Sequence, residues 1–109
     1  MDLAAFLAPG VYPVFMAGGS LDGEPWGHVL SRPGGRVSWL AREPALAGES
    51  LFLTLKVPGY HLGADGSLFP AVGLELGAWV VLSGEVMGCR LVQERRYLLR
   101  LAGLVRVLD

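Results

Sequence analysis

The stretch LGAWVVLSGEVMGC, from Leu76 to Cys89, decides the fold of this chain. Successive side chains of an extended strand point to opposite faces, so the stretch has two distinct sides. One side is small and apolar and consists of Ala78, Val80, Leu82, Gly84 and Val86. The other side mixes an indole, aliphatic and polar groups and consists of Trp79, Val81, Ser83, Glu85 and Met87. This asymmetry predicts a strand with one face in a core and the other face at a working surface.

The composition of the chain bounds its class. The 109 residues are enough for one domain with a single core. The apolar fraction of 52% is high and the charged fraction of 17% is low, which favours a homo-oligomer, with a dimer expected. No run approaches ~18 uninterrupted apolar residues, so no membrane span is expected. The first ten residues lack the basic start of a secretory signal, and the single Cys89 suits a reducing cytoplasm, where we expect the protein to reside.

Glycine and proline divide the chain into short β-type segments. Strands are expected at residues 10–18, 25–32, 36–41, 51–57 and 76–89, and residues 95–108 form the last one or two. The second and third of these form a hairpin around Pro33, and Pro13 places the first at an edge or a bulge. Residues 58–77 are expected to form a long loop with one helical turn near 72–76, and residues 90–94 join the last strands. The pattern predicts an all-β domain with little helix, built as a small sandwich or closed barrel, in which Gly84 marks a bend.

The motifs of enzymes are missing from this sequence. No phosphate-binding glycine loop and no nucleophile elbow is present. His28 and His61 lie far apart without further ligands at metal-binding spacing, and Asp22 with Glu24 lies in a glycine-rich loop where acidic residues are usually solvated. We therefore expect no metal, no cofactor and no enzymatic activity.

Basic and aromatic residues provide the functional signal. The net charge is −1, so a nucleic-acid surface would have to be a local patch. Eight of the nine basic residues are arginines, which suit phosphate contacts, although genome composition or a warm habitat would produce the same bias. Proteins that bind single strands combine a positive groove with aromatic platforms for the bases. The alternative is that the aromatic residues fill the core, and Trp39 and Trp79 fit either interpretation.

The order of the segments resembles the bacterial single-stranded DNA-binding protein family. VFMAGGSLDGEPWGHV (Val14 to Val29) resembles its opening strand and turn, and RPGGRVSWLA (Arg32 to Ala41) its second strand. ESLFLTLKVPG (Glu49 to Gly59) resembles the third strand, and LELGAWVVLSGEV (Leu74 to Val86) resembles the glycine- and valine-spaced fourth. RRYLLRLAGLVRVLD closes the chain as the family's last strand does. In shape the chain is most similar to the primosomal replication protein B type, which is a lone OB domain.

The resemblance implies a fold and a function. It implies a single OB-fold domain over residues 1–109, a five-stranded barrel preceded by a short extension at residues 1–10. The implied function is non-enzymatic binding of single-stranded DNA, or of RNA, in DNA replication, repair or replication restart. In the family the outward strand faces and long loops carry nucleic acid. Position by position, this places Trp39 and Lys56 on outward faces and Arg90 and Arg95 in the last loop.

The predicted nucleic-acid-binding residues combine arginine or lysine with aromatic side chains. They are Trp26, Arg32, Arg36, Trp39, Arg42, Lys56, Tyr60, Arg90, Arg95, Arg96 and Arg100. The alternative hypothesis is an OB-fold protein-interaction subunit without a nucleic-acid role, which the high apolar fraction and near-neutral charge favour.

Overall fold

A computed structural model describes residues 3–71 and 77–107 of the chain. Within these ranges it contains one short helical turn and eight strands. Their bounds are η1 Leu3–Ala5, β1 Gly10–Met16, β2 Gly27–Arg32, β3 Arg36–Ala41, β4 Ser50–Pro58, β5 Tyr60–Leu62, β6 Leu68–Pro70, β7 Gly77–Gln93 and β8 Arg96–Val107. No described helix is long and apolar enough to cross a membrane.

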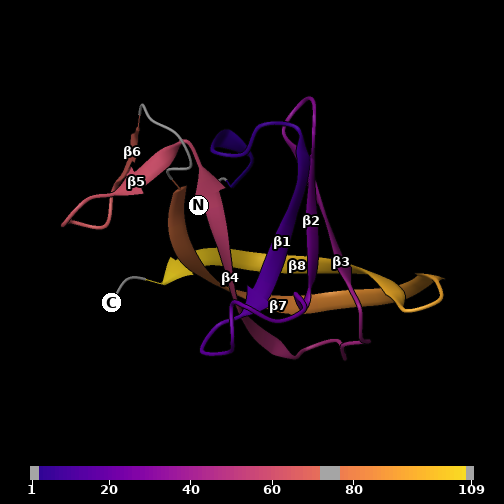
Figure 1. The fold of residues 1–109 in the computed structure, drawn as a ribbon. Coiled ribbons are helices and arrows are strands. Elements are labelled where there is room, and N and C mark those ends of the chain that lie inside the picture. Colours follow the sequence, from indigo (N-terminus) through magenta and orange to yellow (C-terminus); the bar gives the residue numbers. More distant parts are fainter. Residues whose placement is uncertain (1–2, 72–76, 108–109) are drawn as a thin grey trace.

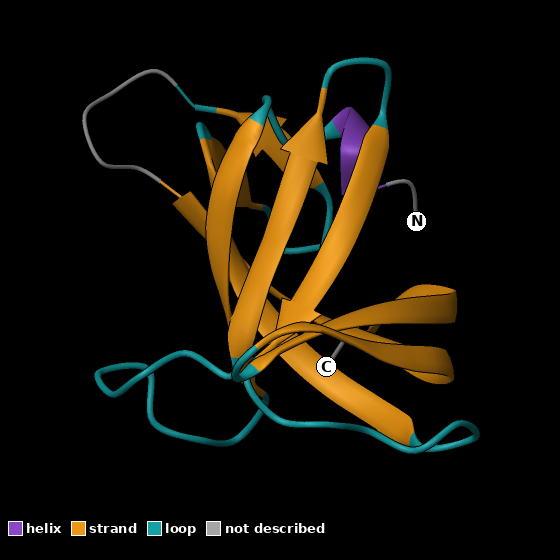
Figure 2. Cartoon of the chain, turned by 90° about the vertical axis from the view of Figure 1, so that its right-hand side faces the viewer, coloured by secondary structure: helices purple, strands orange, loops and turns teal. Residues whose placement is uncertain are grey.

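Six of the strands close into a barrel. Their order is β1-β2-β3-β8-β7-β4, with β4 pairing back onto β1, and every pair of neighbours is antiparallel (Figure 1). The all-β fold with a closed barrel and little helix is therefore confirmed, and it is compatible with an OB-like barrel. The barrel has six strands, one for each of the six predicted segments, whereas the resemblance implied five. Viewed from the side, the helical turn lies at the opposite end of the barrel from the two long loops, which join β1 to β2 and β3 to β4 (Figure 2).

The β2–β3 hairpin forms as its sequence predicts. Gly34 and Gly35 have φ angles of 91° and 80°, a left-handed conformation that side chains with a Cβ atom rarely adopt. The hairpin continues without a register shift from Arg32 opposite Arg36 to Gly27 opposite Ala41. Pro13 lies in the part of β1 that pairs with β2 alone, so its missing N–H group is tolerated there.

β7 and β8 form a hairpin that is longer than predicted. β7 runs to Gln93, so Arg90 belongs to this strand and not to a connecting loop, and the prediction of a joining segment at residues 90–94 is wrong. Only Glu94 and Arg95 form the turn, and Arg95 has a left-handed φ of 57°. The bend predicted at Gly84 is present as a register shift between Ser83 and Glu85.

The core lies inside the barrel and is made by the inward side of each strand. Val80, Leu82 and Val86 are buried as predicted, and every second residue of β4 from Leu51 to Val57 faces them. Leu3 and Leu7 of the N-terminal segment pack against the same cluster. This arrangement shows that the hydrophobic alternation of each strand determines which of its faces points inward.

The prediction of a long loop is wrong for residues 58–71. β5 and β6 form a small separate hairpin, in which the side chain of Asp65 accepts hydrogen bonds from the backbone N–H and the hydroxyl of Ser67. These hydrogen bonds lower the pKa of the Asp65 carboxyl below its ordinary value. The Arg106 guanidinium donates to the carbonyl of Gly66 and ties the hairpin to β8. The helical turn predicted near residues 72–76 lies outside the described residues.

Candidate nucleic-acid interface

The register of the barrel determines which side chains point outward from β2, β3 and β8. Val29, Trp39 and Leu99 are paired across these strands and are buried, so they face the core. Their neighbours along each strand therefore point away from it. His28, Leu40, Leu98 and Arg90 lie in one continuous outward row, because each is the register partner of the next.

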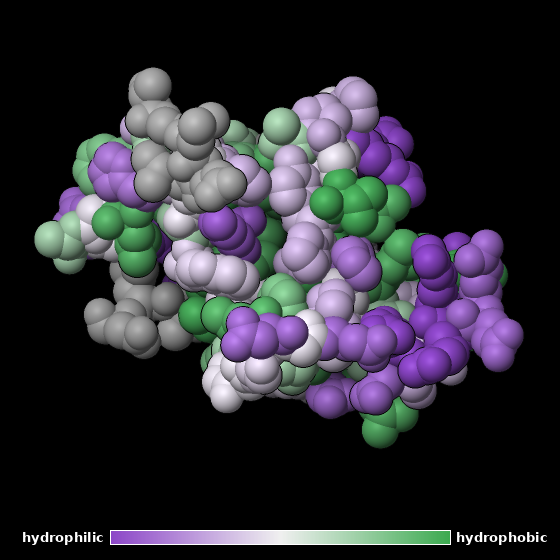
Figure 3. All heavy atoms as spheres, viewed as in Figure 1, coloured by the Kyte–Doolittle hydropathy of each residue, from purple (hydrophilic) through white to green (hydrophobic). Residues whose placement is uncertain are grey.

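Six arginines share this outward side, and we call them the basic face. They are Arg32, Arg36, Arg42, Arg90, Arg96 and Arg100. Five of them are exposed, and Arg42, which directly follows β3, is partly buried. Arg95 lies beside them in the β7–β8 turn. Hydrophilic atoms gather over the end of this hairpin on the right of the space-filling view (Figure 3). The structure thus brings together all seven arginines that the sequence predicted for the site.

Two arginines of the basic face oppose each other directly. Arg32 and Arg36 are register partners at the end of the β2–β3 hairpin. Like charges directly across a strand pair destabilise a sheet, and a bound anion would relieve this repulsion. The pair is therefore suited to a phosphate group.

A groove with an apolar floor lies against three of the seven arginines, Arg42, Arg95 and Arg96. It has a volume of 580 Å³ and lies between the β1–β2–β3 wall and the β7–β8 turn. Leu30 and Leu40 form its floor, while His28, Arg42 and Arg96 also line it. We call it the corner groove. Cationic edges around an apolar floor suit a ligand with both phosphates and flat rings.

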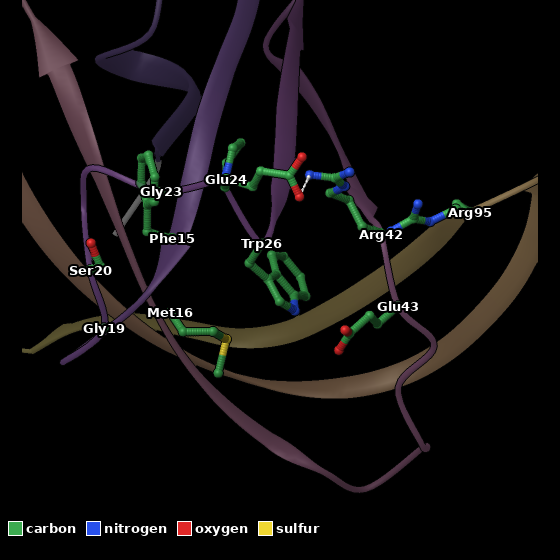
Figure 4. A pocket seen from close by; sticks show the side chains of 11 residues that line it. Phe15, Met16, Gly19, Ser20, Gly23, Glu24, Trp26, Arg42, Glu43 and Arg95 are labelled. Atoms are coloured by element: carbon green, nitrogen blue, oxygen red, sulfur yellow. Dashed lines mark ion pairs between the residues drawn. The ribbon is translucent and has the colours of Figure 1, made fainter.

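The Trp26 pocket adjoins the corner groove. It has a volume of 390 Å³, and the two cavities share Glu24, Pro25, Arg42 and Arg95. The indole of Trp26 projects into the pocket between Met16 and Glu43 (Figure 4). The backbone N–H of Arg42 donates to the Trp26 carbonyl over 3.1 Å and holds the two walls together. Trp26 packs against the core with part of its surface, and the exposed part offers an aromatic surface beside the basic face.

Carboxylates moderate the charge of both cavities. Glu24 contacts the guanidinium of Arg42 at 2.7 Å (Figure 4), and both residues line both cavities. Glu43 lines the Trp26 pocket and Glu94 lines the corner groove. Because both members of the Glu24–Arg42 pair reach solvent, we expect the pair to be weak and displaceable.

Three predicted site residues lie elsewhere. Trp39 is only 3% exposed, so the prediction of an outward stacking surface is wrong. The reason is its register, since Trp39 is paired with two core residues, Val29 and Leu99. Lys56 is exposed on β4, which is not part of the basic face. Tyr60 begins β5 and packs edge to face on Phe6, with the ring centroids 5.4 Å apart.

Sequence reasoning missed the floor of the corner groove. His28 was considered only as a metal ligand, and Leu30 and Leu40 were not singled out. Residues two apart in a strand share a face, and Val29 and Trp39 face the core, so His28, Leu30 and Leu40 fall on the outward face. This alternation is the signal that identifies the floor. Within the described ranges no group of three or more histidine, cysteine or acidic side chains could hold a metal ion. Cys89 is a free, exposed thiol on β7.

Comparisons with known proteins do not identify a relative. No family model, no curated protein and no solved structure matches this chain. The resemblance to the single-stranded DNA-binding protein family therefore stays a prediction.

Proposed function

We propose that this protein binds single-stranded DNA through the basic face and the two adjoining cavities, without catalysing a reaction. The observation that carries the proposal is that six arginines of β2, β3, β7, β8 and the residue after β3 share one outward side. Two of them, Arg42 and Arg96, line a groove together with the apolar side chains of Leu30 and Leu40. Arginine suits this role because its planar guanidinium stays charged and can donate two parallel hydrogen bonds to one phosphate.

The apolar floor and Trp26 favour a single strand over a duplex. In a duplex the faces of the bases are stacked inside and present no flat surface to a protein. In a single strand the bases can turn onto aromatic and aliphatic side chains while the phosphates follow the cationic edge. A protein with this mode of binding would act where DNA strands are unpaired, as in replication, repair or replication restart.

A titration with a fluorescently labelled oligo(dT) tests the proposal. Anisotropy is measured at low and at raised salt, with a duplex of equal length as the comparison. We expect binding to the single strand at low salt, weakening as salt rises because condensed counterions are released on binding. The proposal fails if the single strand does not bind at low salt, or if its binding is insensitive to salt.

The exposed aromatic side chains of β4 and β7 favour a second candidate function. Phe52 and Trp79 lie on the outside of these strands, apart from the basic face. A protein-interaction subunit without a nucleic-acid role would use such a surface. Replacing these aromatic residues and replacing the arginines distinguish the two candidates. DNA binding is favoured if the aromatic variants keep full salt-sensitive binding to the oligonucleotide and the arginine variants lose it.

A further inference from the structure

An apolar patch covers the outer side of β4 and of the first half of β7. Phe52 is 51% exposed and Trp79 is 41% exposed. Val105 of β8 is 53% exposed and continues the row that Phe52 begins, because Ser83 pairs with both residues. With the partly buried Val81, these side chains form a patch that we call the apolar face. Exposed apolar side chains that gather on one face of a sheet favour an interaction site.

The apolar face is supported by a second layer of packing. Phe15 of β1 lies outside the core cluster, yet Trp79 packs on it edge to face with the ring centroids 6.0 Å apart. Phe15 and its register partner Thr54 are both buried as a result. Trp79 is therefore held in place by its neighbours, which lowers the entropy that a partner would have to remove on binding.

Opposite charges stand at the two ends of the apolar face. Lys56 is the register partner of Trp79, and Glu85 lies six residues further along β7. At the rise of an extended strand this separation is about 20 Å. Both side chains are exposed, and among the described residues neither forms an ion pair. One end of the face is thus positive, the other is negative, and the middle is apolar.

We propose that a second copy of this chain docks on the apolar face. In a symmetric dimer the same surface is used by both subunits, so the surface must be complementary to itself. A twofold axis that runs across the strands at the middle of the face brings Lys56 of each subunit opposite the partner's Glu85. It also stacks the row of Phe52 and Val105 on the partner's row of Val81, as sheets stack in a sandwich, while Trp79, level with Lys56, lies beside the charge pair. A partner of unrelated sequence would not require this particular arrangement of charges.

The proposed dimer leaves the basic face free. The arginines lie on the outward sides of β2, β3 and the end of the β7–β8 hairpin, whereas the dimer uses β4 and the opposite end of that hairpin. The inference does not depend on DNA binding, and it is tested without nucleic acid.

The oligomeric state of the purified full chain tests the proposal. Light scattering after size exclusion, over a series of protein concentrations, should show a monomer–dimer equilibrium. Phe52→Ser should shift this equilibrium toward monomer by tenfold or more. Leu91→Ser is the matched control, because it removes an equally exposed apolar side chain from the end of the β7–β8 hairpin. Circular dichroism establishes that each variant is folded.

A charge exchange gives the decisive comparison. Lys56→Glu and Glu85→Lys should each weaken the dimer, because each places like charges across the interface. The double variant should restore it, since the exchanged charges again attract. A chain that is monomeric at all concentrations overturns the proposal. So does a dimer that Leu91→Ser weakens more than Phe52→Ser, or one that the double exchange does not restore.

Discussion

Replacing Arg96 by glutamine should weaken single-stranded DNA binding and reduce its dependence on salt. Arg96 is exposed at the start of β8 and lines the corner groove. Its register partner is Gln93, so the substitution breaks no ion pair within the described residues. The variant therefore tests phosphate contact separately from folding.

The magnitude follows from the number of arginines that a strand can reach. An OB-fold that binds single strands covers ~4–16 nucleotides, so we take four neutralised phosphates as a conservative number for the proposed binding. Single strands give a slope of about −0.7 per neutralised phosphate in log K against log salt, or about −2.8 for four. A fourfold rise in salt then weakens binding roughly 50-fold in the parent. With one contact fewer the slope is about −2.1, and the same rise weakens binding roughly 20-fold.

The assay is the anisotropy titration at five or so salt concentrations, with Arg106→Gln as the control. Arg106 loses the same charge, but it is the register partner of the core residue Leu82 and so points to the inward side of β8. Because Arg106 also donates to the Gly66 carbonyl, circular dichroism first establishes that this variant is folded. We expect its slope to match that of the parent. The reasoning is refuted if Arg96→Gln keeps the parental slope, or if both variants flatten it equally.

Further variants test the other assignments. Trp26→Ala should weaken oligonucleotide binding about tenfold or more, because one stacked base contributes ~1–3 kcal/mol, and unchanged affinity would exclude stacking there. Trp39→Ala should instead lower the free energy of unfolding by about 3–5 kcal/mol in a urea titration, and a loss below ~1 kcal/mol would contradict its place in the core. Glu24→Gln frees Arg42 and should steepen the salt slope by about 0.7 while tightening binding at low salt, whereas weaker binding would show that Glu24 helps the site. Gly27→Ala puts a Cβ atom against the Leu40 carbonyl, so it should cost roughly 1–3 kcal/mol or more, and a thermal melt like that of the parent would contradict the β2–β3 register.

The strands were predictable because each carries its own local pattern. The β4 segment alternates apolar and polar residues, and the same period appears in the first half of β7. β3 runs from Arg36 to Ala41 as predicted, because a Pro-Gly-Gly turn precedes it and fixes where the strand begins. A period of two combined with turn residues is enough to assign a strand and its inward face.

The misassigned residues depended on contacts that are distant in sequence. Trp39 shares a face of β3 with Val37 and Ala41, so the period of two favours its burial, whereas the family resemblance places it on the outward face. The pairing of Trp39 with the buried Leu99, 60 residues later, shows that Trp39 points into the core. The β5–β6 hairpin was missed because its strands have three residues each, which is too short for periodicity to appear. Arg106 anchors that hairpin from β8, again a contact that no local pattern indicates.

The basic face depends both on the local pattern within each strand and on the pairing of strands that are distant in sequence. Within each strand the buried residues fix the inward side. An arginine that alternates with them therefore points outward, and it needs no stabilising contact to do so. Whether the outward sides of different strands form one surface depends on which strands pair. β3 pairs with β8, with Leu40 opposite Leu98. This pairing joins the arginines of the β2–β3 hairpin to those of the β7–β8 hairpin. A change that broke this pairing would leave each hairpin with its arginines but divide the surface in two. For this reason the closure of the barrel, more than the number of arginines, is what the proposed DNA binding requires.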